Sequence, residues 1–318
     1  MNYNIKNILY GLIVSALLAI ISQSASSYLG LFLFGLKKSP ISPIIVALLL
    51  GIVLGNKFDF QTRFGLGFLF CIKYVLRFGI VLMGIRLGLV EILDFGFKSF
   101  SIVIPCIIIT LIITNRIADG FGLKSTMASL IAVGTSICGA SAIIAFAPTI
   151  SAKKNEVVFA IANITVFGIV AMILYPIIAN LLFPTDSISA GIFLGASIHE
   201  TAQVAGAGMI YAQQYSQLQV LEISTLTKLV RNTAMVFVIP YMAYKNSSPS
   251  SARSTISQIQ SIFPYFIIGF IGFGVLRTLG DIGINETGLA FRILDSAKWD
   301  RLILYIISIS KFSLIMAM

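Results

Sequence analysis

The sequence has very few charged residues for its length. Of its 318 residues, 11% are charged and 58% are hydrophobic, whereas a soluble domain carries about 25% charged residues. So little polar surface could not cover the core of a soluble chain of this size. The composition therefore excludes a soluble globular enzyme, a disordered chain and a coiled coil, and it predicts a multi-pass membrane protein with short loops.

Cysteine and histidine are also scarce, which excludes several kinds of site. The three cysteines, Cys71, Cys106 and Cys138, are far apart in apolar surroundings, and His199 is the single histidine. The sequence therefore predicts no metal site, no cofactor and no disulfide framework. The phosphate-loop spacing does not occur, so the chain encodes no ATPase motor of its own. The Gly-x-Ser-x-Gly nucleophile elbow does not occur either.

Acidic residues are outnumbered, and this leaves a large positive charge. The chain has 22 Lys and Arg against 12 Asp and Glu, a net charge of +10. Anionic lipid, the positive-inside rule or an anionic substrate would each explain the excess. One set of cations lies in predicted loops and fits the first two explanations: Lys37, Lys38, Lys57, Lys153 and Lys154. A second set lies inside apolar runs and favours an anion at the membrane midplane: Lys73, Arg77, Arg86, Lys228 and Arg231.

Apolar runs of about 20 residues mark the transmembrane segments. They lie at roughly 8–28, 40–56, 64–90, 97–115, 126–152, 157–183, 187–211, 219–243, 260–280 and 299–318. The first run also fits a secretory signal peptide, but an uncleaved helix is favoured because the rest of the chain is itself polytopic. Residues 1–318 are thus predicted to form one all-α domain, a transmembrane helical bundle of about 9–10 segments.

The run 64–90 contains a conflict between two arginines. Arg86 follows Arg77 by nine residues, which places it about 180° around an unbroken helix. One cavity cannot take both side chains unless the helix breaks at Gly79 or Gly84. Otherwise at least one of the two arginines is interfacial.

A weak internal repeat connects two segments rich in small residues. Gly134-Thr-Ser136-Ile137 begins the first and Gly195-Ala-Ser197-Ile198 the second, 61 residues later. Each is followed by an apolar segment that ends at a proline, Pro176 or Pro240. Many secondary transporters are built from such repeats with discontinuous helices. Chance similarity between apolar helices explains the pattern equally well.

The first of these segments, Gly134–Ala142, combines two glycines, three hydroxyls and a thiol within an apolar run. Glycines loosen a helix, and hydroxyls satisfy the freed backbone groups. The N-terminus of a half-helix here would direct its N–H groups at an anion. Close helix packing by small residues is the alternative. The candidate substrate-binding residues are Thr135, Ser136, Cys138, Gly139 and Ser141.

The second segment, Gly195–Gln203, places several polar residues between apolar runs. Ionisable residues at membrane depth usually face a cavity. Glu200 is suited to bind a cation or carry a proton, and His199 to titrate near neutral pH. An interfacial turn wetted by headgroups is the alternative. The candidates are His199 and Glu200 for ion coupling, and Ser197, Thr201 and Gln203 for substrate binding.

A third group, Lys228, Arg231 and Asn232, shares one helix face because the spacings are three and four residues. Pro240 follows nine residues after Arg231, so the two cations lie within the span rather than beyond its end. Two cations on one buried face suit a divalent or carboxylate anion. The alternative is that both side chains extend to lipid phosphate.

These motifs, taken together, resemble a known family over roughly residues 40–318. Gly134–Ala142 resembles its G-T-x-I-C-G-x-S-A signature, and the match continues through Tyr175-Pro176 and Gly195–Val204. Thr227–Arg231 resembles its K-L-x-R stretch, and Leu76–Leu87 its L-R-x-G-I-x-L-x-G-x-R-L block. The family is that of the YeiH-type bacterial inner-membrane proteins, labelled as sulfate exporters.

The resemblance implies a fold like that of the sodium–proton antiporters and bile-acid symporters, with broken helices crossing at mid-membrane. It also implies residence in a bacterial inner membrane. Ser310–Met318 matches a stretch that in the family continues into a further Gly-rich turn and helix.

The leading hypothesis is therefore a secondary transporter, not an enzyme. Its substrate would be a small inorganic or sulfur-containing anion such as sulfate or sulfite, coupled to sodium or a proton. Its expected partners are that anion and the lipid bilayer, not nucleic acid. Two alternatives stay open: an intramembrane hydrolase that pairs Ser136 or Cys138 with His199, and a membrane sensor.

Overall fold

The computed structural model describes residues 5–34, 42–57, 60–246 and 265–317, and in them the chain is almost entirely helical. Within these residues the only strands are β1 (Leu289–Ala290) and β2 (Leu294–Asp295), a short antiparallel hairpin. The predicted all-α class is confirmed. The loop cations Lys37 and Lys38 lie outside the described residues.

Five helical stretches among the described residues are long and apolar enough to cross a membrane: 6–29, 63–86, 89–118, 154–182 and 266–287. Further apolar helices, at 43–57, 140–150 and 187–197, have only 10–17 residues, and a helix rises about 1.5 Å per residue. Each is too short to span about 30 Å of hydrocarbon alone. The protein is a multi-pass membrane protein that combines full spans with shorter helices.

Contacts divide the chain into two compact units. Unit 1 comprises Met1–Leu93, Ala205–Glu222 and Phe266–Met318, and unit 2 comprises Asp94–Val204 and Ile223–Tyr265. Three helices contribute residues to both units: α5 (Leu89–Gly120), α10 (Thr201–Gln214) and α11 (Gln219–Thr233). The sequence predicted that residues 1–318 form one membrane domain, and this stays a prediction.

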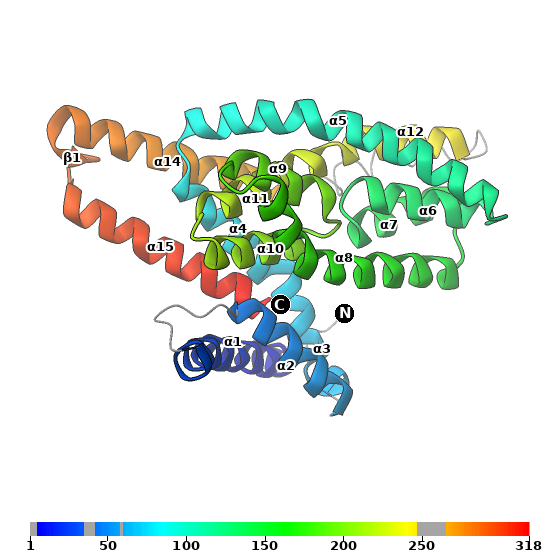
Figure 1. The fold of residues 1–318 in the computed structure, drawn as a ribbon, viewed down its shortest axis with the longest axis horizontal. Helices are drawn as coiled ribbons and strands as arrows, with labels where there is room; N and C mark the ends of the chain where they lie inside the picture. The colour runs from blue at the N-terminus through cyan, green and yellow to red at the C-terminus, as the bar shows by residue number, and fades with distance from the viewer. Residues whose placement is uncertain (1–4, 35–41, 58–59, 247–264, 318) are drawn as a thin grey trace. The chain divides into compact units, whose positions relative to one another are not determined.

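Unit 1 begins with α1 (Ile5–Phe34), which packs against α2 (Pro43–Lys57) and α3 (Phe60–Phe70). Glycines allow the close crossing of α1 and α3, since a Cβ on Gly11 would lie 2.6 Å from the Cα of Gly67. After a π-helical turn, η1 (Cys71–Val75), the chain continues as α4 (Leu76–Met83). Two later helices, α14 (Phe266–Thr287) and α15 (Ser296–Met316), are joined by the hairpin and both pack on α4 (Figure 1).

The helix that carries Arg77 breaks at Gly84, before Arg86, but the two arginines have different surroundings: Arg77 is exposed, whereas the Arg86 side chain is 13% exposed. At Gly84 it tightens into a 3₁₀ turn, η2 (Gly84–Arg86), and Leu87 is extended. A Cβ on Gly84 would lie 2.1 Å from the carbonyl oxygen of Phe270. Only glycine therefore allows α14 to approach the turn this closely.

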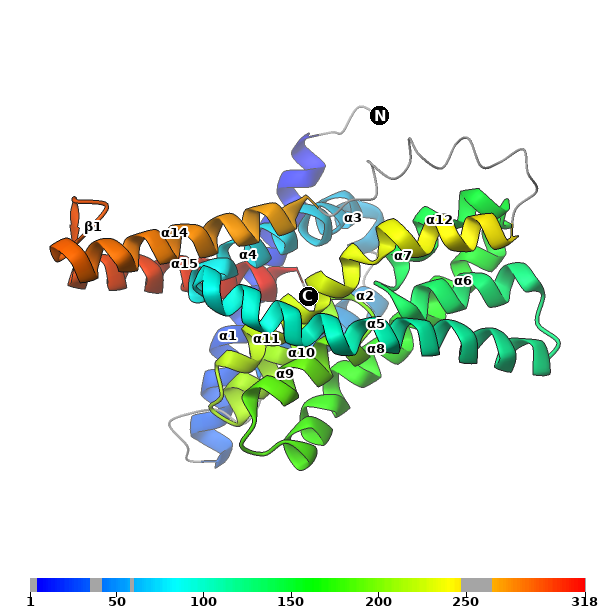
Figure 2. The same ribbon diagram turned by 90° about the horizontal axis from the view of Figure 1, so that it is seen from above.

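Unit 2 contains the first interrupted helix that the sequence predicted and the break of the second (Figure 2). The run 126–152 forms α6 (Ser125–Ser136), α7 (Ala140–Phe146) and η3 (Ala147–Ile150). The run 187–211 forms α9 (Ser187–Ser197) and then α10. The long helix α8 (Lys154–Leu182) packs against α6, α7 and α9, and α12 (Met235–Asn246) packs against α6 and α7.

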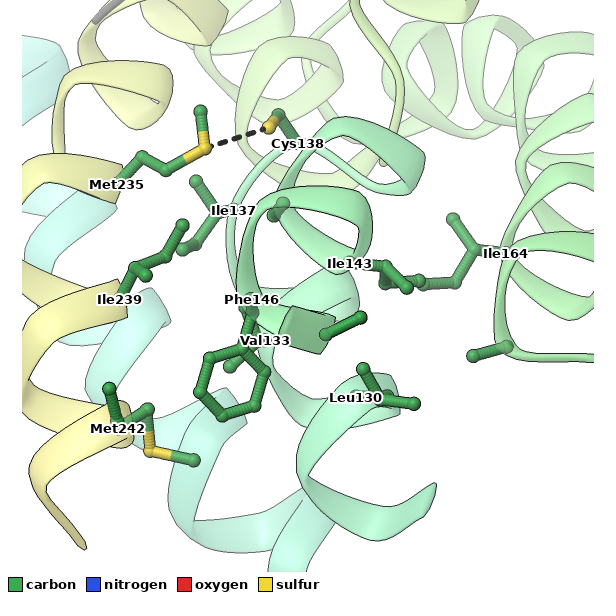
Figure 3. Close-up of a cluster of buried hydrophobic side chains, with 14 residues drawn as sticks. Leu130, Val133, Ile137, Cys138, Ile143, Phe146, Ile164, Met235, Ile239 and Met242 are labelled. Carbon is green, nitrogen blue, oxygen red and sulfur yellow. Dashed lines mark hydrogen bonds between the residues drawn. The ribbon is translucent and has the colours of Figure 1, made fainter. Parts of the chain in front are cut away.

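An apolar cluster fixes the two halves of the first broken helix in unit 2. It joins α6, α7, α8 and α12 through residues that include Leu130, Phe146, Ile164 and Met242 (Figure 3). Gly134 lies in this packing, since a Cβ there would be 2.3 Å from the Cδ1 of Ile164. Close helix packing therefore explains Gly134, while the second glycine of the segment has a different role.

Candidate functional site

The first break lies between Ser136, the last residue of α6, and Ala140, the first of α7. Gly139 has φ +71°, a left-handed conformation that residues with a side chain rarely adopt. The hydroxyl of Ser136 donates to the carbonyl of Ala132 at 2.5 Å, within its own helix. The break thus leaves backbone carbonyls at the end of α6 without helical partners.

The second break has the same form. Here α9 ends at Ser197, whose hydroxyl donates to the Phe193 carbonyl at 2.5 Å, and Ile198 is extended. Glu200 precedes α10, and its N–H donates to the Gln203 side-chain oxygen at 3.3 Å. This is one half of a capping box. Hence α10 begins with its own cap, while the last carbonyls of α9 have no partner within the helix.

Lys228 of α11 connects the two breaks. Its ammonium donates to the Ile137 carbonyl at 2.8 Å and to the Ile198 carbonyl at 2.9 Å. The side chain is fully buried. A buried ammonium is costly unless it is compensated, and here the compensation comes from the negative ends of two helix dipoles.

Arg231, three residues later, donates to carbonyls from the same two breaks. Its Nε donates to Ser136 at 2.8 Å and its Nη2 to Thr135. Its Nη1 donates to Ala196 at 2.5 Å and to Ile198 at 3.3 Å. The two cations therefore satisfy the carbonyls that would otherwise be unpaired in an apolar environment.

The accepting carbonyls support the internal repeat. Thr135 and Ala196 are 61 positions apart, and so are Ile137 and Ile198. This is the offset at which the two sequence segments align. Equivalent atoms of the two repeats thus bind the same pair of cations, which chance similarity between apolar helices would not produce.

Glu200 is where the two repeats differ, because its counterpart at that offset is Gly139. A Cβ on Gly139 would lie 2.9 Å from the Cγ of Glu200, so the glycine makes room for the acid. The Glu200 carboxylate accepts a hydrogen bond from the Ala140 N–H, at the start of α7. The half-helix end that the sequence offered to an external anion therefore faces a carboxylate of the chain itself.

Polar side chains from α10 and α11 also meet beside the second break. Asn232 donates from Nδ2 to the Thr201 hydroxyl at 3.2 Å, and Gln203 donates to the Thr165 carbonyl at 3.2 Å. Two buried atoms, Asn232 Oδ1 and His199 Nδ1, have no hydrogen-bond partner among the described residues.

Two predicted substrate residues point elsewhere. Cys138 lies in the apolar cluster with its Sγ 3.7 Å from the Sδ of Met235 (Figure 3), and Ser141 is exposed on α7. Ser136 donates to its own helix, and His199 Nδ1 is unpaired. The Ser136 hydroxyl is therefore not hydrogen-bonded to His199 Nδ1, and the hydrolase alternative stays a prediction. Substrate contact by the predicted residues stays a prediction.

The end of α9 that lies away from the break is capped by an exposed carboxylate, Asp186, which accepts from the N–H groups of Ile188 and Ser189 at 3.0 Å. The Ser189 hydroxyl donates to the same carboxylate at 2.6 Å. These hydrogen bonds, first that of the Ser189 hydroxyl, hold the pKa of Asp186 below its usual value. They stabilise the charged form, so α9 has an anion at its N-terminus and cations at its C-terminus.

Sequence reasoning missed a buried acid in unit 1. Glu222, in the first turn of α11, is 3% exposed, and its Oε1 lies 2.6 Å from the Nε of Arg86. An acid in the first turn of a helix is ordinarily explained by the helix dipole. The sequence placed Arg86 inside an apolar run but carried no signal that pairs it with Glu222.

Comparisons with known proteins agree with the membrane assignment. A family model described as conserved hypothetical protein 698 matches residues 10–318. A UPF0324 membrane protein of Fusobacterium nucleatum is 32% identical over 98% of this chain and 87% of the relative. One of Streptococcus agalactiae is 31% identical over 90% of this chain and 81% of the relative. No solved structure matches the chain.

Proposed function

We propose that this chain, which belongs to the UPF0324 membrane protein family, is a secondary transporter of a small anion. The proposal rests on the pair of broken helices, α6–α7 and α9–α10. The carbonyls at their breaks have no partner within the helix and accept hydrogen bonds from Lys228 and Arg231. Non-helical backbone at membrane depth is tolerated where it lines a cavity or is buried in protein. In secondary transporters such discontinuous helices form the substrate and ion sites.

The charge at these breaks favours an anionic substrate. Lys228 and Arg231 are opposed by one acid, Glu200, so the group has an excess of one positive charge. An ammonium has three N–H donors and a guanidinium five. Lys228 makes two hydrogen bonds and Arg231 four. Each cation therefore keeps one donor for a ligand.

Sulfate and sulfite are the proposed substrates, and export the proposed direction. Both oxyanions are small, and their oxygens match the remaining donors of Lys228 and Arg231. The resemblance to the YeiH-type family supports the same class. Thr201, Gln203 and Asn232 provide neutral polar groups on the same side of the second break.

Glu200 and His199 are the proposed coupling residues. Glu200 is bound at the start of α7 and His199 Nδ1 is free. A sodium ion or a proton at either residue would offset the charge of a second negative group at the site. Coupling by an ion gradient is also what a transporter without an ATPase motor requires.

Flux of labelled sulfate and sulfite into proteoliposomes tests the proposal. Wild-type protein should accumulate one of them when a sodium or proton gradient is imposed, and Asn232→Ala should reduce the initial rate at unchanged protein level. Ser141→Ala, on the exposed side of α7, is the matched control and should transport normally. If vesicles that contain wild-type protein move sulfate and sulfite no faster than protein-free vesicles, with either gradient, the proposed function is refuted.

A further inference from the structure

A further cation that is largely buried, Arg86, lies in unit 1 and is not part of the site described above. It ends the 3₁₀ turn η2, where the chain leaves the helical path. Its Nε lies 2.6 Å from Oε1 of Glu222, and the two side chains are 13% and 4% exposed. A buried ion pair repays its desolvation only when geometry and additional hydrogen bonds are favourable.

The pairing of Arg86 with Glu222 is incomplete. The two atoms are close, but Oε1 accepts no well-aligned hydrogen bond, and the buried Nη1 of Arg86 has no acceptor among the described residues. Buried donors without a partner are rare, because an unpaired polar group in the interior is destabilising. A guanidinium can bind an oxyanion with two parallel donors, so Arg86 retains capacity that Glu222 does not use.

The charged groups that face Glu222 come from three elements. They are Arg86 of η2, Lys311 of α15 and Glu91 at the start of α5. Glu91 accepts a hydrogen bond from the Gly88 N–H at 3.0 Å and so caps its own helix. Glu222 thus contacts one cation, Arg86, and is attracted electrostatically by a second, Lys311, while Glu91 repels it. A small external oxyanion would be attracted by the same two cations.

We propose that Arg86 is an anion-binding residue and that Glu222 is its internal competing ligand, which is released by protonation. A proton adds to the Glu222 carboxylate to give a neutral carboxylic acid, while Arg86 keeps its charge and takes up the oxyanion. One proton is therefore bound with each anion. The proposal rests on the proposed function only for the class of anion, a small oxyanion such as sulfate.

Sulfate binding to the purified full chain, measured by calorimetry between about pH 8 and about pH 5, tests this linkage. Sulfate and methanesulfonate serve as probes because neither titrates in that range. Wild-type affinity should rise as the pH falls, by up to about tenfold per pH unit for one linked proton. Glu222→Gln mimics the protonated acid, so it should keep the acid-pH affinity at every pH.

The double variant Arg86→Gln/Glu222→Gln replaces the ion pair with neutral amides and leaves no buried charge unpaired. It should bind either anion at least about tenfold more weakly than wild type at pH 5, without pH dependence. Asp94→Asn/Lys98→Gln is the matched control, because this pair is separated by 2.7 Å but exposed. It should behave like wild type.

Three results would overturn the proposal: a Glu222→Gln protein with the wild-type pH slope, a double variant with wild-type affinity, or wild-type protein that binds neither probe. The flux assay separates this from the proposed function. Proton-linked binding without flux would refute transport and leave the Arg86 site standing. Sulfate flux in wild type together with wild-type affinity in the double variant would refute the Arg86 site and leave transport standing.

Discussion

The two units solve the same problem, a buried cation, with partners of different chemistry. In unit 2, Lys228 and Arg231 are held by backbone carbonyls from two helix ends. In unit 1, Arg86 is held by the carboxylate of Glu222. Carbonyls do not titrate, so the acceptors of the first arrangement keep the same charge state at every pH. A carboxylate does titrate, so the second can be switched by a proton, and the following predictions test that difference.

The largest effect is expected in unit 2, from Arg231→Met. The substitution removes the donor for Thr135, Ser136 and Ala196 carbonyls, and each buried acceptor left unpaired costs roughly 1–3 kcal/mol. We expect most of the folded protein to be lost, as measured by size exclusion in detergent, at every pH. Arg231→Lys should recover part of it, and a well-folded Met variant would contradict the capping role.

A smaller but pH-dependent loss is expected in unit 1, from Arg86→Met. Removing one member of a buried pair leaves an uncompensated charge on Glu222, which costs about 3–5 kcal/mol. Thermal unfolding should show the loss at neutral pH and its recovery in acid, because protonation removes the charge. The double variant Arg86→Gln/Glu222→Gln should melt near the wild-type temperature at both pH values. If Arg86→Met lost the same thermal stability at both pH values, the charge of Glu222 would not be the cause, and the contrast with unit 2 would fail.

The breaks could be predicted from the sequence, but the contacts that hold them could not. Small and polar residues within 126–152 and 187–211 indicated the interruptions, and Pro240 indicated that Lys228 and Arg231 lie within the span. Their acceptors are main-chain carbonyls, which every residue has, so no residue type marks them. The partners that the sequence suggested for the two cations were an external anion and lipid phosphate.

The positions of three side chains could not be predicted from the sequence. The positive φ of Gly139 turns the chain between α6 and α7, so the helical periodicity that would orient Cys138 and Ser141 does not continue across the break. Glu222 shows the opposite difficulty, since it lies in a regular helix. Its burial depends on Arg86, 136 positions earlier, and a single sequence carries no signal for such a pair.

Gly139→Ala should have a moderate effect that is specific to the first break. A left-handed conformation costs a residue with a side chain about 1–2 kcal/mol, and the new Cβ would lie 2.9 Å from the Cγ of Glu200. We expect a lower melting temperature and a lower sulfate flux, because Glu200 must move from the start of α7.

Gly51→Ala is the matched control for that substitution. A Cβ on Gly51 would meet nothing within 4 Å, and alanine is the better helix former by about 1 kcal/mol. This variant should be as stable as wild type or slightly more so, with unchanged flux. Equal losses from both substitutions would show that Gly139 acts only through general helix propensity.

The smallest effect is expected from substitutions of Asp186. They sharpen the comparison because the two ends of one helix, α9, differ: its N-terminus is capped by a titratable carboxylate, and its C-terminal carbonyls are bound by cations. Asp186→Ala removes a cap worth about 1 kcal/mol, whereas Asp186→Asn keeps an acceptor. The pKa of Asp186 is held below its usual value, so its stabilising effect is present above the usual aspartate pKa and is lost as the pH falls through the lowered one. The melting-temperature difference between wild type and Asp186→Asn should therefore vanish in strong acid, and a difference that persists there would assign the cap to shape rather than charge.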